Sequence, residues 1–130
     1  MPKVSVVVPA RNEPYLNNTI RDLLEKARGD IEVIAVLDGH WDVEVIDDPR
    51  VHYILHGKSK GLRGSSNAGV DVAKGEYVMK IDAHCMFGEG YDVILTEDCE
   101  RDWVVVPRRK RLDAENWKPV EDGRPDIDYM

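Results

Sequence analysis

Little in this sequence points to an extracellular or nucleic-acid-binding protein. Among 130 residues there are only two cysteines, Cys85 and Cys99, too few for a disulfide framework or a cysteine-rich zinc site. The 18 basic residues are outnumbered by 25 acidic ones, which gives a net charge of -7, whereas a nucleic-acid phosphate backbone demands a basic face. We therefore expect no nucleic-acid partner and a reducing, cytoplasmic location.

Long apolar runs are also missing. No stretch approaches the roughly 20 residues that a helix needs to cross a bilayer, so we expect no membrane segment in this chain. The first apolar run, at residues 4–9, is too short for a signal peptide and is typical of a strand. With 42% hydrophobic and 33% charged residues, the composition instead fits a single globular domain with a modest core.

Apolar strands alternate with helices along the chain. A run rich in β-branched residues at 4–9 predicts a strand covered on both faces, and the largely apolar run at 31–38 predicts a second buried strand. Further strands are expected at 50–56 (nearer an edge), 77–82 and 102–107, with helices at 16–27, about 62–73 and within 90–100. The alternation predicts an α/β fold, a three-layer sandwich with a mostly parallel sheet.

Two helical stripes support this assignment. The first helix places apolar residues on one face, namely Leu16, Ile20, Leu23, Leu24 and Ala27. The second is expected to turn small and apolar residues toward the sheet, namely Leu62, Ser66, Gly69, Val70 and Ala73. Periodicity is lost after residue 107, so we expect a domain at residues 1–107 and an extended charged tail at residues 108–130.

Polar side chains follow the predicted strands. Ligands of open parallel sheets bind outside the carboxyl ends of the strands. The residues there are Pro9, Ala10, Arg11 and Glu13 after the first strand, Asp38 and Gly39 after the second, Lys60 and Arg63 after the third, and Asp82 and His84 at the end of the fourth. Acids at two strand ends beside a loop rich in glycine and basic residues suit an anionic ligand carried with a divalent cation.

Each of these features also has a simpler structural explanation. Asp38-Gly39 is a common turn after a strand, and Asp-x-His alone is a weak motif. The glycines at 61, 64 and 69 match neither the P-loop nor the dinucleotide-binding fingerprint. Those two classes of nucleotide-binding protein are therefore disfavoured.

Three segments, in order, carry a family resemblance. VSVVVPARNE is similar to V-S-V-V-I-P-x-Y-N-E, and IEVIAVLDGH to E-I-I-V-V-D-D-G-S. KGLRGSSNAGVDVAKGEYVMKIDAH resembles G-x-x-x-A-R-N-x-G-x-x-x-A-x-G-E-Y-I-x-F-L-D-A-D. These are motifs of glycosyltransferase family 2, and the chain resembles its nucleotide-sugar half from residue 3 to about 107. The resemblance implies the Rossmann-like GT-A fold and transfer of a sugar from a nucleoside-diphosphate donor, with UDP favoured, to an acceptor hydroxyl.

The same resemblance implies roles for individual residues. Pro9, Ala10, Arg11 and Glu13 would lie at the nucleotide pocket, as would Gly39 and Lys60. Asp38 would hydrogen-bond a uracil-type base, and Arg63 would approach the diphosphate. Asp82 occupies the first position of the family's D-x-D motif, which meets the ribose or the metal, and His84 occupies the last position, as a metal ligand.

Two departures from the family pattern refine this expectation. Leu37 stands where the family has the first Asp of D-D-G-S, and His84 replaces the last Asp of D-x-D. IDAHC instead resembles the LDAHC of polypeptide N-acetylgalactosaminyltransferases, a related GT-A family with a D-x-H metal motif. Residues i and i+2 leaving a strand project to the same side, so Asp82 and His84 can reach one ion. Imidazole suits transition metals better than Mg²⁺, so we predict Mn²⁺ as cofactor.

Other classes remain open at this stage. Residues 108–130 are too few for an acceptor-binding half, so the catalytic residue, the acceptor and the stereochemical outcome are unassigned. One alternative is a non-catalytic module that binds a sugar nucleotide or a protein partner. Another is a nucleotidyltransferase, although PARNEPYLNN after the first strand lacks the glycine-rich activation loop of that class.

Overall fold

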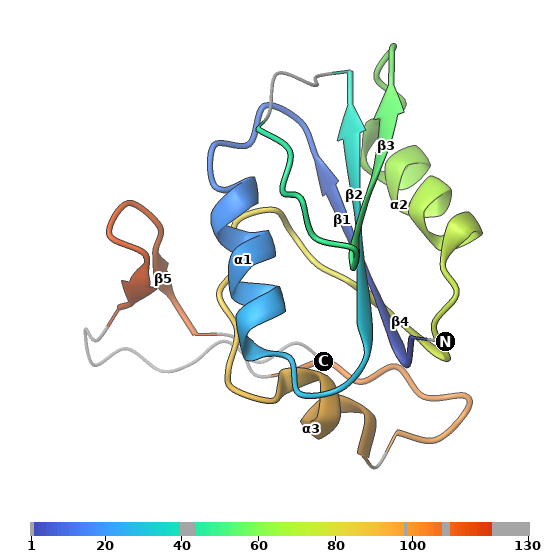
Figure 1. The fold of residues 1–130 in the computed structure, drawn as a ribbon, viewed down its shortest axis with the longest axis vertical. Coiled ribbons are helices and arrows are strands. Elements are labelled where there is room, and N and C mark those ends of the chain that lie inside the picture. Colours follow the sequence, from blue (N-terminus) through green and yellow to red (C-terminus); the bar gives the residue numbers. More distant parts are fainter. Residues whose placement is uncertain (1, 40–43, 98, 108–109, 121–130) are drawn as a thin grey trace.

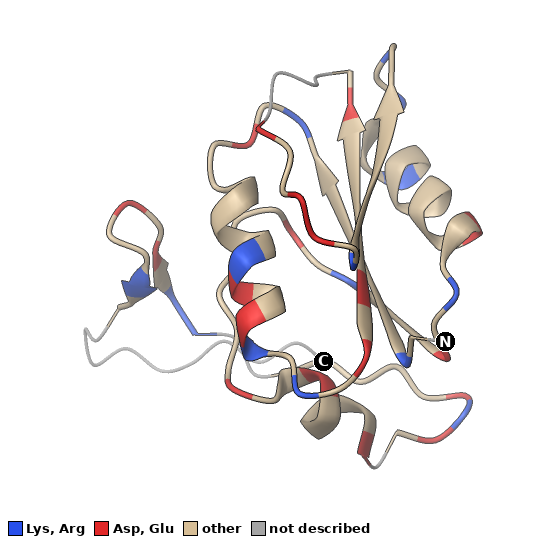
Figure 2. Ribbon diagram, in the orientation of Figure 1, with Lys and Arg blue, Asp and Glu red and all other residues tan. Residues whose placement is uncertain are grey.

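Four parallel strands form the central sheet of the computed structural model (Figure 1). The structure describes residues 2–39, 44–97, 99–107 and 110–120. The strands are β1 (Val4–Ala10), β2 (Ile31–Asp38), β3 (Val51–His56) and β4 (Tyr77–Lys80), in the order β3-β2-β1-β4. Every residue of β1 and β2 is buried, which confirms the two doubly covered strands. Figure 2 shows that β1 carries no charged residue along its length.

Helices cover both faces of the sheet, as predicted for a three-layer α/β fold (Figure 1). Helix α1 (Leu16–Lys26) packs its buried residues Leu16, Ile20 and Leu23 into a cluster with the even-numbered valines of β1. On the opposite face, α2 (Gly61–Val72) lies over Val7 of β1, Ile34 and Val36. The stripe predicted for α1 is confirmed.

The face predicted for α2 needs correction. Leu62 and Val70 are 60% and 45% exposed, while Ser65 and Gly69 are the buried residues of this helix. A Cβ atom added at Gly69 would lie 2.4 Å from Val7 Cγ1, so the helix approaches the sheet where its side chains are smallest. The close approach of the helix to the sheet at Gly69 therefore decides which face of α2 is buried. Leu62 and Val70 remain exposed beside this contact.

The two edge strands differ from the central pair. β3 is an edge strand, as its more polar sequence predicts. β4 is shorter than expected: it ends at Lys80, and Ile81 donates one further hydrogen bond to the Val7 carbonyl before the chain turns away. Val78 and Lys80 of β4 are exposed, whereas Tyr77 and Met79 pack against the core, so this strand is covered on one face only.

The strand predicted at residues 102–107 does not form. These residues are irregular and exposed, and Val104 is 89% exposed. A β-branched run becomes a strand only when a neighbouring strand supplies hydrogen bonds and packing. Within the described residues, 102–107 pairs with no strand. Local β propensity therefore gave the wrong prediction here.

The remaining elements are short. Helix α3 (Tyr91–Glu97) lies within the predicted helical range, and its Asp92 accepts hydrogen bonds from the N–H groups of Arg28 and Gly29 after α1. Part of the predicted tail forms a small antiparallel hairpin, β5 (Leu112–Asp113) with β6 (Lys118–Pro119), instead of an extended chain. Residues 108–109 and 121–130 of that tail lie outside the described residues.

No helix in the described part of the chain combines the length and the apolar character needed to span a membrane.

Candidate functional site

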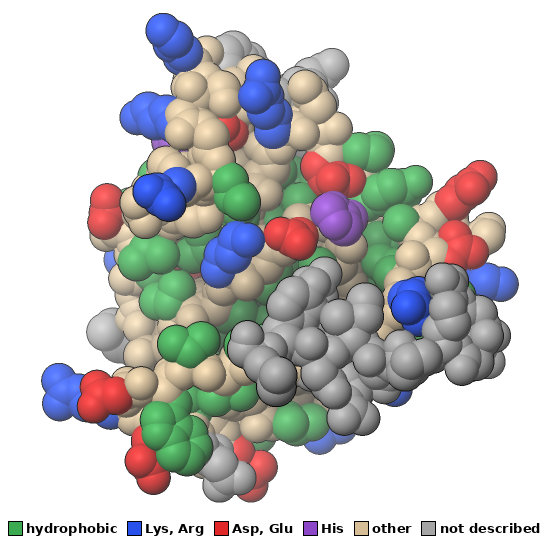
Figure 3. Space-filling model, turned by 180° about the vertical axis from the view of Figure 1, so that it is seen from behind, with side chains coloured by type: hydrophobic (Ala, Val, Ile, Leu, Met, Phe, Trp, Pro, Cys, Tyr) green, Lys and Arg blue, Asp and Glu red, His purple; other side chains and the backbone are tan. Residues whose placement is uncertain are grey.

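The carboxyl ends of the parallel strands meet at one edge of the sheet, at the top of Figure 1. Of the predicted residues, Arg11, Lys60 and Arg63 are exposed there, together with Lys58. Figure 3 shows basic side chains gathered at this end of the molecule, near acidic and histidine side chains. This end thus concentrates positive charge in a chain whose net charge is -7.

The loop between β1 and α1 is fixed by its own backbone and by Glu13. Pro9 and Ala10 are buried at the end of β1, and Asn12 then adopts the left-handed conformation with φ of 52°. Glu13 Oε1 accepts a hydrogen bond from the Tyr15 N–H at 3.2 Å. A carboxylate near the amino end of a helix can accept a hydrogen bond from an unpaired N–H group and interacts favourably with the helix dipole. The loop therefore presents Glu13 in a defined position.

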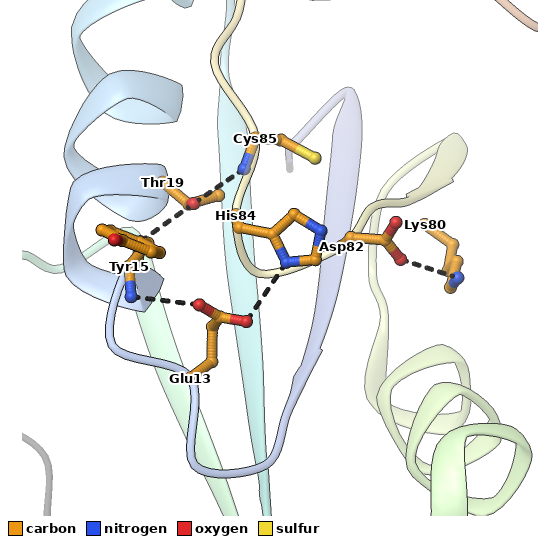
Figure 4. Close-up of polar contacts among 7 residues, drawn as sticks. All are labelled: Glu13, Tyr15, Thr19, Lys80, Asp82, His84 and Cys85. Atoms are coloured by element: carbon orange, nitrogen blue, oxygen red, sulfur yellow. Dashed lines mark hydrogen bonds and ion pairs between the residues drawn. The ribbon is translucent and has the colours of Figure 1, made fainter. Parts of the chain in front are cut away.

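Glu13 also contacts the predicted metal ligand His84. Its second oxygen, Oε2, lies 3.1 Å from His84 Nδ1, as Figure 4 shows. The His84 side chain is 55% exposed and that of Glu13 is 20% exposed. In Figure 4 the other ring nitrogen of His84, Nε2, faces the side on which Asp82 lies. The structure thus joins the first and fourth strand ends through this pair.

Helix α1 anchors the segment that follows His84. The Cys85 N–H donates to Thr19 Oγ1 at 3.0 Å, and the Phe87 N–H donates to Asp22 Oδ2 at 2.6 Å. Both acceptors are buried side chains of α1. Sequence reasoning missed these roles, because Thr19 and Asp22 are polar residues within an apolar helical face, and that irregularity is the signal that could have revealed them.

Asp82 is accessible. Its side chain is 42% exposed, and its closest polar partner is Lys80 Nζ at 3.4 Å. An exposed ion pair of this kind contributes little to stability, so the carboxylate is available to a ligand. Asp82 offers an oxygen donor and His84 Nε2 a nitrogen donor, but the predicted strand geometry that would turn both to one side does not hold, because β4 ends at Lys80 and the Asp82 carboxylate is turned toward Lys80 (Figure 4).

This donor set is incomplete for a metal held by protein alone. Within the described residues, no group of three or more His, Cys, Asp and Glu side chains is placed to hold an ion. Two exposed donors leave coordination positions open for the oxygens of a ligand. The residues present therefore fit a divalent cation that arrives with an anionic ligand, as opposed to a structural metal.

Asp38 is committed to contacts within the protein. It is buried at the end of β2, and its Oδ1 accepts the Lys60 N–H at 2.7 Å while its Oδ2 accepts the Gly61 N–H at 2.9 Å. Ser59 Oγ donates to Oδ2 at 2.7 Å, and His56 Nδ1 lies 3.2 Å from Oδ1. Asp38 thus caps the start of α2 from the end of β2, and all four of these contacts lie within the protein.

Those hydrogen bonds also decide the charge of Asp38. Burial alone would raise the pKa of its carboxyl group. The donors from Lys60, Ser59, His56 and Gly61 outweigh burial and hold that pKa well below its usual range. Asp38 is therefore an anion that orders the loop carrying Lys60. His56, a residue that sequence reasoning did not single out, is part of this network.

The basic side chains of Lys60 and Arg63 are available to a ligand. In the described part of the chain, the side chains of Lys60 and Arg63 form no ion pair, and Arg63 lies on the first turn of α2. Gly39, with φ of 74°, turns the chain after β2 and packs against the backbone of Ser59. Within the same residues, no hydrogen bond joins Asp38 to Asp82 or His84, so the site comprises two separately supported groups.

An open depression at the amino ends of the strands is a weaker candidate. It is lined by Glu32, Arg50, His52 and Lys74, among others. Its charged groups bond to neighbouring protein groups: Glu32 accepts from the Ser5 hydroxyl and the Lys74 N–H, and Arg50 pairs with Asp48. The Glu32 contacts tie β1 and β2 to the segment that follows α2, and the Arg50–Asp48 pair lies in the segment before β3, so both have a structural role.

The molecule is an open, parallel α/β sheet with charged groups at the carboxyl ends of its strands, which is where proteins of this class bind their ligands. A family model described as "Glycosyl transferase family 2" matches residues 5–124. The chain belongs to glycosyl transferase family 2.

Named relatives agree with this assignment. The chain is 32% identical over 114 residues to "Uncharacterized glycosyltransferase EpsJ" of Bacillus subtilis (strain 168), covering 82% of this chain and 33% of that protein. It is 33% identical over 107 residues to "Putative polypeptide N-acetylgalactosaminyltransferase 13" of Drosophila melanogaster, covering 68% of this chain and 19% of that protein. The chain thus spans about a third or less of the length of these relatives.

A solved structure supports the fold. The crystal structure of TarS residues 1–349 from S. aureus is similar with a TM-score of 0.56 and 21% identity, over 73% of this chain and 30% of that one. At this identity, the likeness bears on the fold alone. It agrees with the predicted GT-A architecture.

Proposed function

We propose that this chain is the donor-binding part of a glycosyltransferase, which binds a nucleoside-diphosphate sugar with a divalent cation for transfer of the sugar to an acceptor hydroxyl. The observation that carries the proposal is the pairing of Glu13 with His84 at 3.1 Å, next to the exposed Asp82. These residues lie at the carboxyl edge of a family 2 sheet, where exposed basic residues also gather, and this arrangement supports the proposal.

The residues divide the work by charge. Lys60 and Arg63, at the start of α2, supply positive charge for the diphosphate, and Asp38 keeps their loop in place through the Lys60 and Gly61 N–H groups. Asp82 and His84 would hold the cation. A bound divalent cation would neutralise the diphosphate and so stabilise the departing nucleoside diphosphate.

The finer identity of the ligands rests on the resemblance and on ligand chemistry. UDP is the proposed nucleotide, and Mn²⁺ is preferred to Mg²⁺ because His84 contributes a nitrogen donor. The D-x-H interpretation rests on the resemblance of IDAHC, and one relative is named as a putative polypeptide N-acetylgalactosaminyltransferase. A contact between Asp38 and the base remains a prediction. It would require the base to displace one of the four donors that Asp38 now accepts from, or one carboxylate oxygen to accept a third hydrogen bond.

Calorimetric titration tests this proposal. The chain is titrated with UDP, GDP and TDP, each with Mn²⁺, Mg²⁺ or a chelator, and the titrations are repeated on Asp82→Ala. We expect the tightest binding with UDP and Mn²⁺, and its loss in Asp82→Ala. The control is Asp71→Ala, an exposed carboxylate on α2. If no nucleoside diphosphate binds under any condition, the proposal is wrong.

The second candidate is a non-catalytic module that binds a sugar nucleotide. It is supported by the described residues, which offer groups for binding a sugar nucleotide and leave the catalytic residue unassigned. Release of UDP from a UDP-sugar, followed over time with a panel of acceptors, separates the two functions. Binding without any turnover supports the module.

A further inference from the structure

We infer that Glu13 is a positioning residue that fixes the imidazole of His84 with Nδ1 protonated and Nε2 free to bind the cation. This inference rests on the proposed function and deepens it. The resemblance implies that Glu13 lies at the nucleotide pocket. In the role inferred here, Glu13 does not touch the nucleotide and acts through His84. The two side chains face each other, and further contacts hold Glu13 in place.

Both carboxylate oxygens of Glu13 are in use. Oε1 accepts the Tyr15 N–H at 3.2 Å, which leaves Oε2 to meet His84 Nδ1 at 3.1 Å. The Glu13 backbone carbonyl also accepts the Leu16 N–H at 3.4 Å. These bonds to the start of α1 reduce the rotation open to Glu13, and its side chain is only 20% exposed. Glu13 is thus a fixed acceptor beside an otherwise exposed ring.

A fixed acceptor selects one form of the ring. An ionised carboxylate accepts hydrogen bonds but does not donate them, whereas a neutral imidazole carries one N–H and one free lone pair. With Glu13 opposite Nδ1, the proton belongs on Nδ1, and the lone pair remains on Nε2. Figure 4 shows Nε2 directed away from Glu13, toward the side on which Asp82 lies.

The backbone of His84 is held independently of Glu13. Cys85, the next residue, donates its N–H to Thr19 Oγ1 of α1 at 3.0 Å. Loss of Glu13 would therefore free the imidazole ring without releasing the segment that carries it. Carboxylate partners of metal-binding histidines typically contribute about 10–100-fold to metal affinity. The alternative is a surface ion pair with no further role, which would contribute little to stability and nothing to metal affinity.

Two variants separate positioning from simple attraction of a cation. Glu13→Ala removes the carboxylate. Glu13→Asp keeps the negative charge and a residue suited to the start of a helix, but shortens the side chain by one methylene so that it falls short of His84. If charge alone matters, Glu13→Asp binds the cation as the wild type does. If position matters, both variants lose affinity. Glu25→Asp, at an exposed site on α1, is the matched control.

Two measurements are made on the full chain. Electron paramagnetic resonance follows free Mn²⁺ in the presence of UDP and gives the Mn²⁺ dissociation constant. We expect this constant to rise about 10–100-fold in Glu13→Ala and Glu13→Asp and to stay unchanged in Glu25→Asp. Long-range ¹H–¹⁵N spectra of the metal-free protein at about pH 8, where an ordinary imidazole is neutral, report the protonated nitrogen of His84. We expect Nδ1–H in the wild type and mixed tautomers in both variants.

The outcomes distinguish this inference from the proposed function. Wild-type binding of Mn²⁺ with UDP that persists unchanged in Glu13→Asp, or a wild-type His84 protonated on Nε2, overturns the positioning role and leaves the proposed function standing. Failure of the wild type to bind Mn²⁺ with UDP overturns both. Should Glu13→Ala lose its fold, Glu13→Asp still decides, because it retains a carboxylate for the start of α1.

Discussion

The buried hydroxyl of Thr19 accepts a hydrogen bond from the backbone N–H of Cys85 at 3.0 Å and donates one to the Tyr15 carbonyl at 3.0 Å. This bond fixes the chain immediately after His84 to the first turn of α1. It therefore links the stability of the domain to the geometry of the candidate cation site, although neither residue is expected to touch the ligand.

Thr19→Val tests this link. Valine has nearly the same shape but no acceptor, so the Cys85 N–H loses its partner. We expect the free energy of unfolding to fall by about 1–3 kcal/mol, measured by urea denaturation, and Mn²⁺ affinity in the presence of UDP to fall with it. Thr96→Val is the control, because the Thr96 hydroxyl only donates back to carbonyls of its own helix. Equal stability of the two variants would argue against the anchoring role of Thr19.

Asp38→Asn tests the cap that joins β2 to α2. An amide cannot accept all of the present hydrogen bonds, so we expect a loss of about 2 kcal/mol or more of unfolding free energy at neutral pH. Asp71→Asn, exposed on α2, is the control and should match the wild type. The measurement is urea denaturation followed by circular dichroism.

The same variant has a predicted pH signature. Hydrogen bonds keep the pKa of Asp38 in the folded protein below the unfolded value of about 3.9. Its stabilisation is therefore complete above that pH and is lost as the pH falls below it, because the unfolded state binds the proton first. Asp48, whose pKa the Arg50 hydrogen bonds lower to about 2, adds to the same trend. The slope of stability against pH below about 4 should be smaller in Asp38→Asn than in the wild type, and an unchanged slope would contradict this account.

Gly69→Ala tests the close contact between α2 and the sheet. Alanine normally favours a helix over glycine, but its Cβ would lie 2.4 Å from Val7 Cγ1. We expect destabilisation by about 1–3 kcal/mol, partly recovered in the double variant with Val7→Ala. Gly57→Ala, where an added Cβ has open space, should change stability little. A stabilising Gly69→Ala would show that the sheet and helix can separate at no cost.

His84→Asp tests the basis of the proposed Mn²⁺ preference. The substitution replaces the nitrogen donor with oxygen, giving a pair of carboxylates with Asp82. Because Mg²⁺ prefers oxygen ligands, we expect the ratio of UDP affinity with Mn²⁺ to that with Mg²⁺ to fall relative to the wild type. Calorimetry with each ion measures the ratio. An unchanged ratio, with binding retained, would mean that His84 does not determine the preference.

Sequence patterning alone identified the α/β class and most elements correctly. The runs at β1 and β2 are apolar at most positions, as a doubly covered strand requires, and the stripe of Leu16, Ile20 and Leu23 has only one helical interpretation. These features depend on periodicity within one segment, which a sequence displays directly. The placement of candidate residues at the strand ends followed from the rule for parallel sheets.

Tertiary structure decided which of those residues meet. The Glu13–His84 contact joins residues 71 positions apart, and the Asp38 bonds to Lys60 and Gly61 join residues 22 and 23 apart. The residues at 102–107 had the local propensity for a strand but no partner among the described strands. Propensity and spacing are properties of a segment, whereas hydrogen-bond partners and close approaches such as Gly69 to Val7 arise only when distant segments pack. The sequence therefore determined the elements and the ends at which chemistry is expected, and the packing of α1 and α2 against the sheet determined the contacts made there.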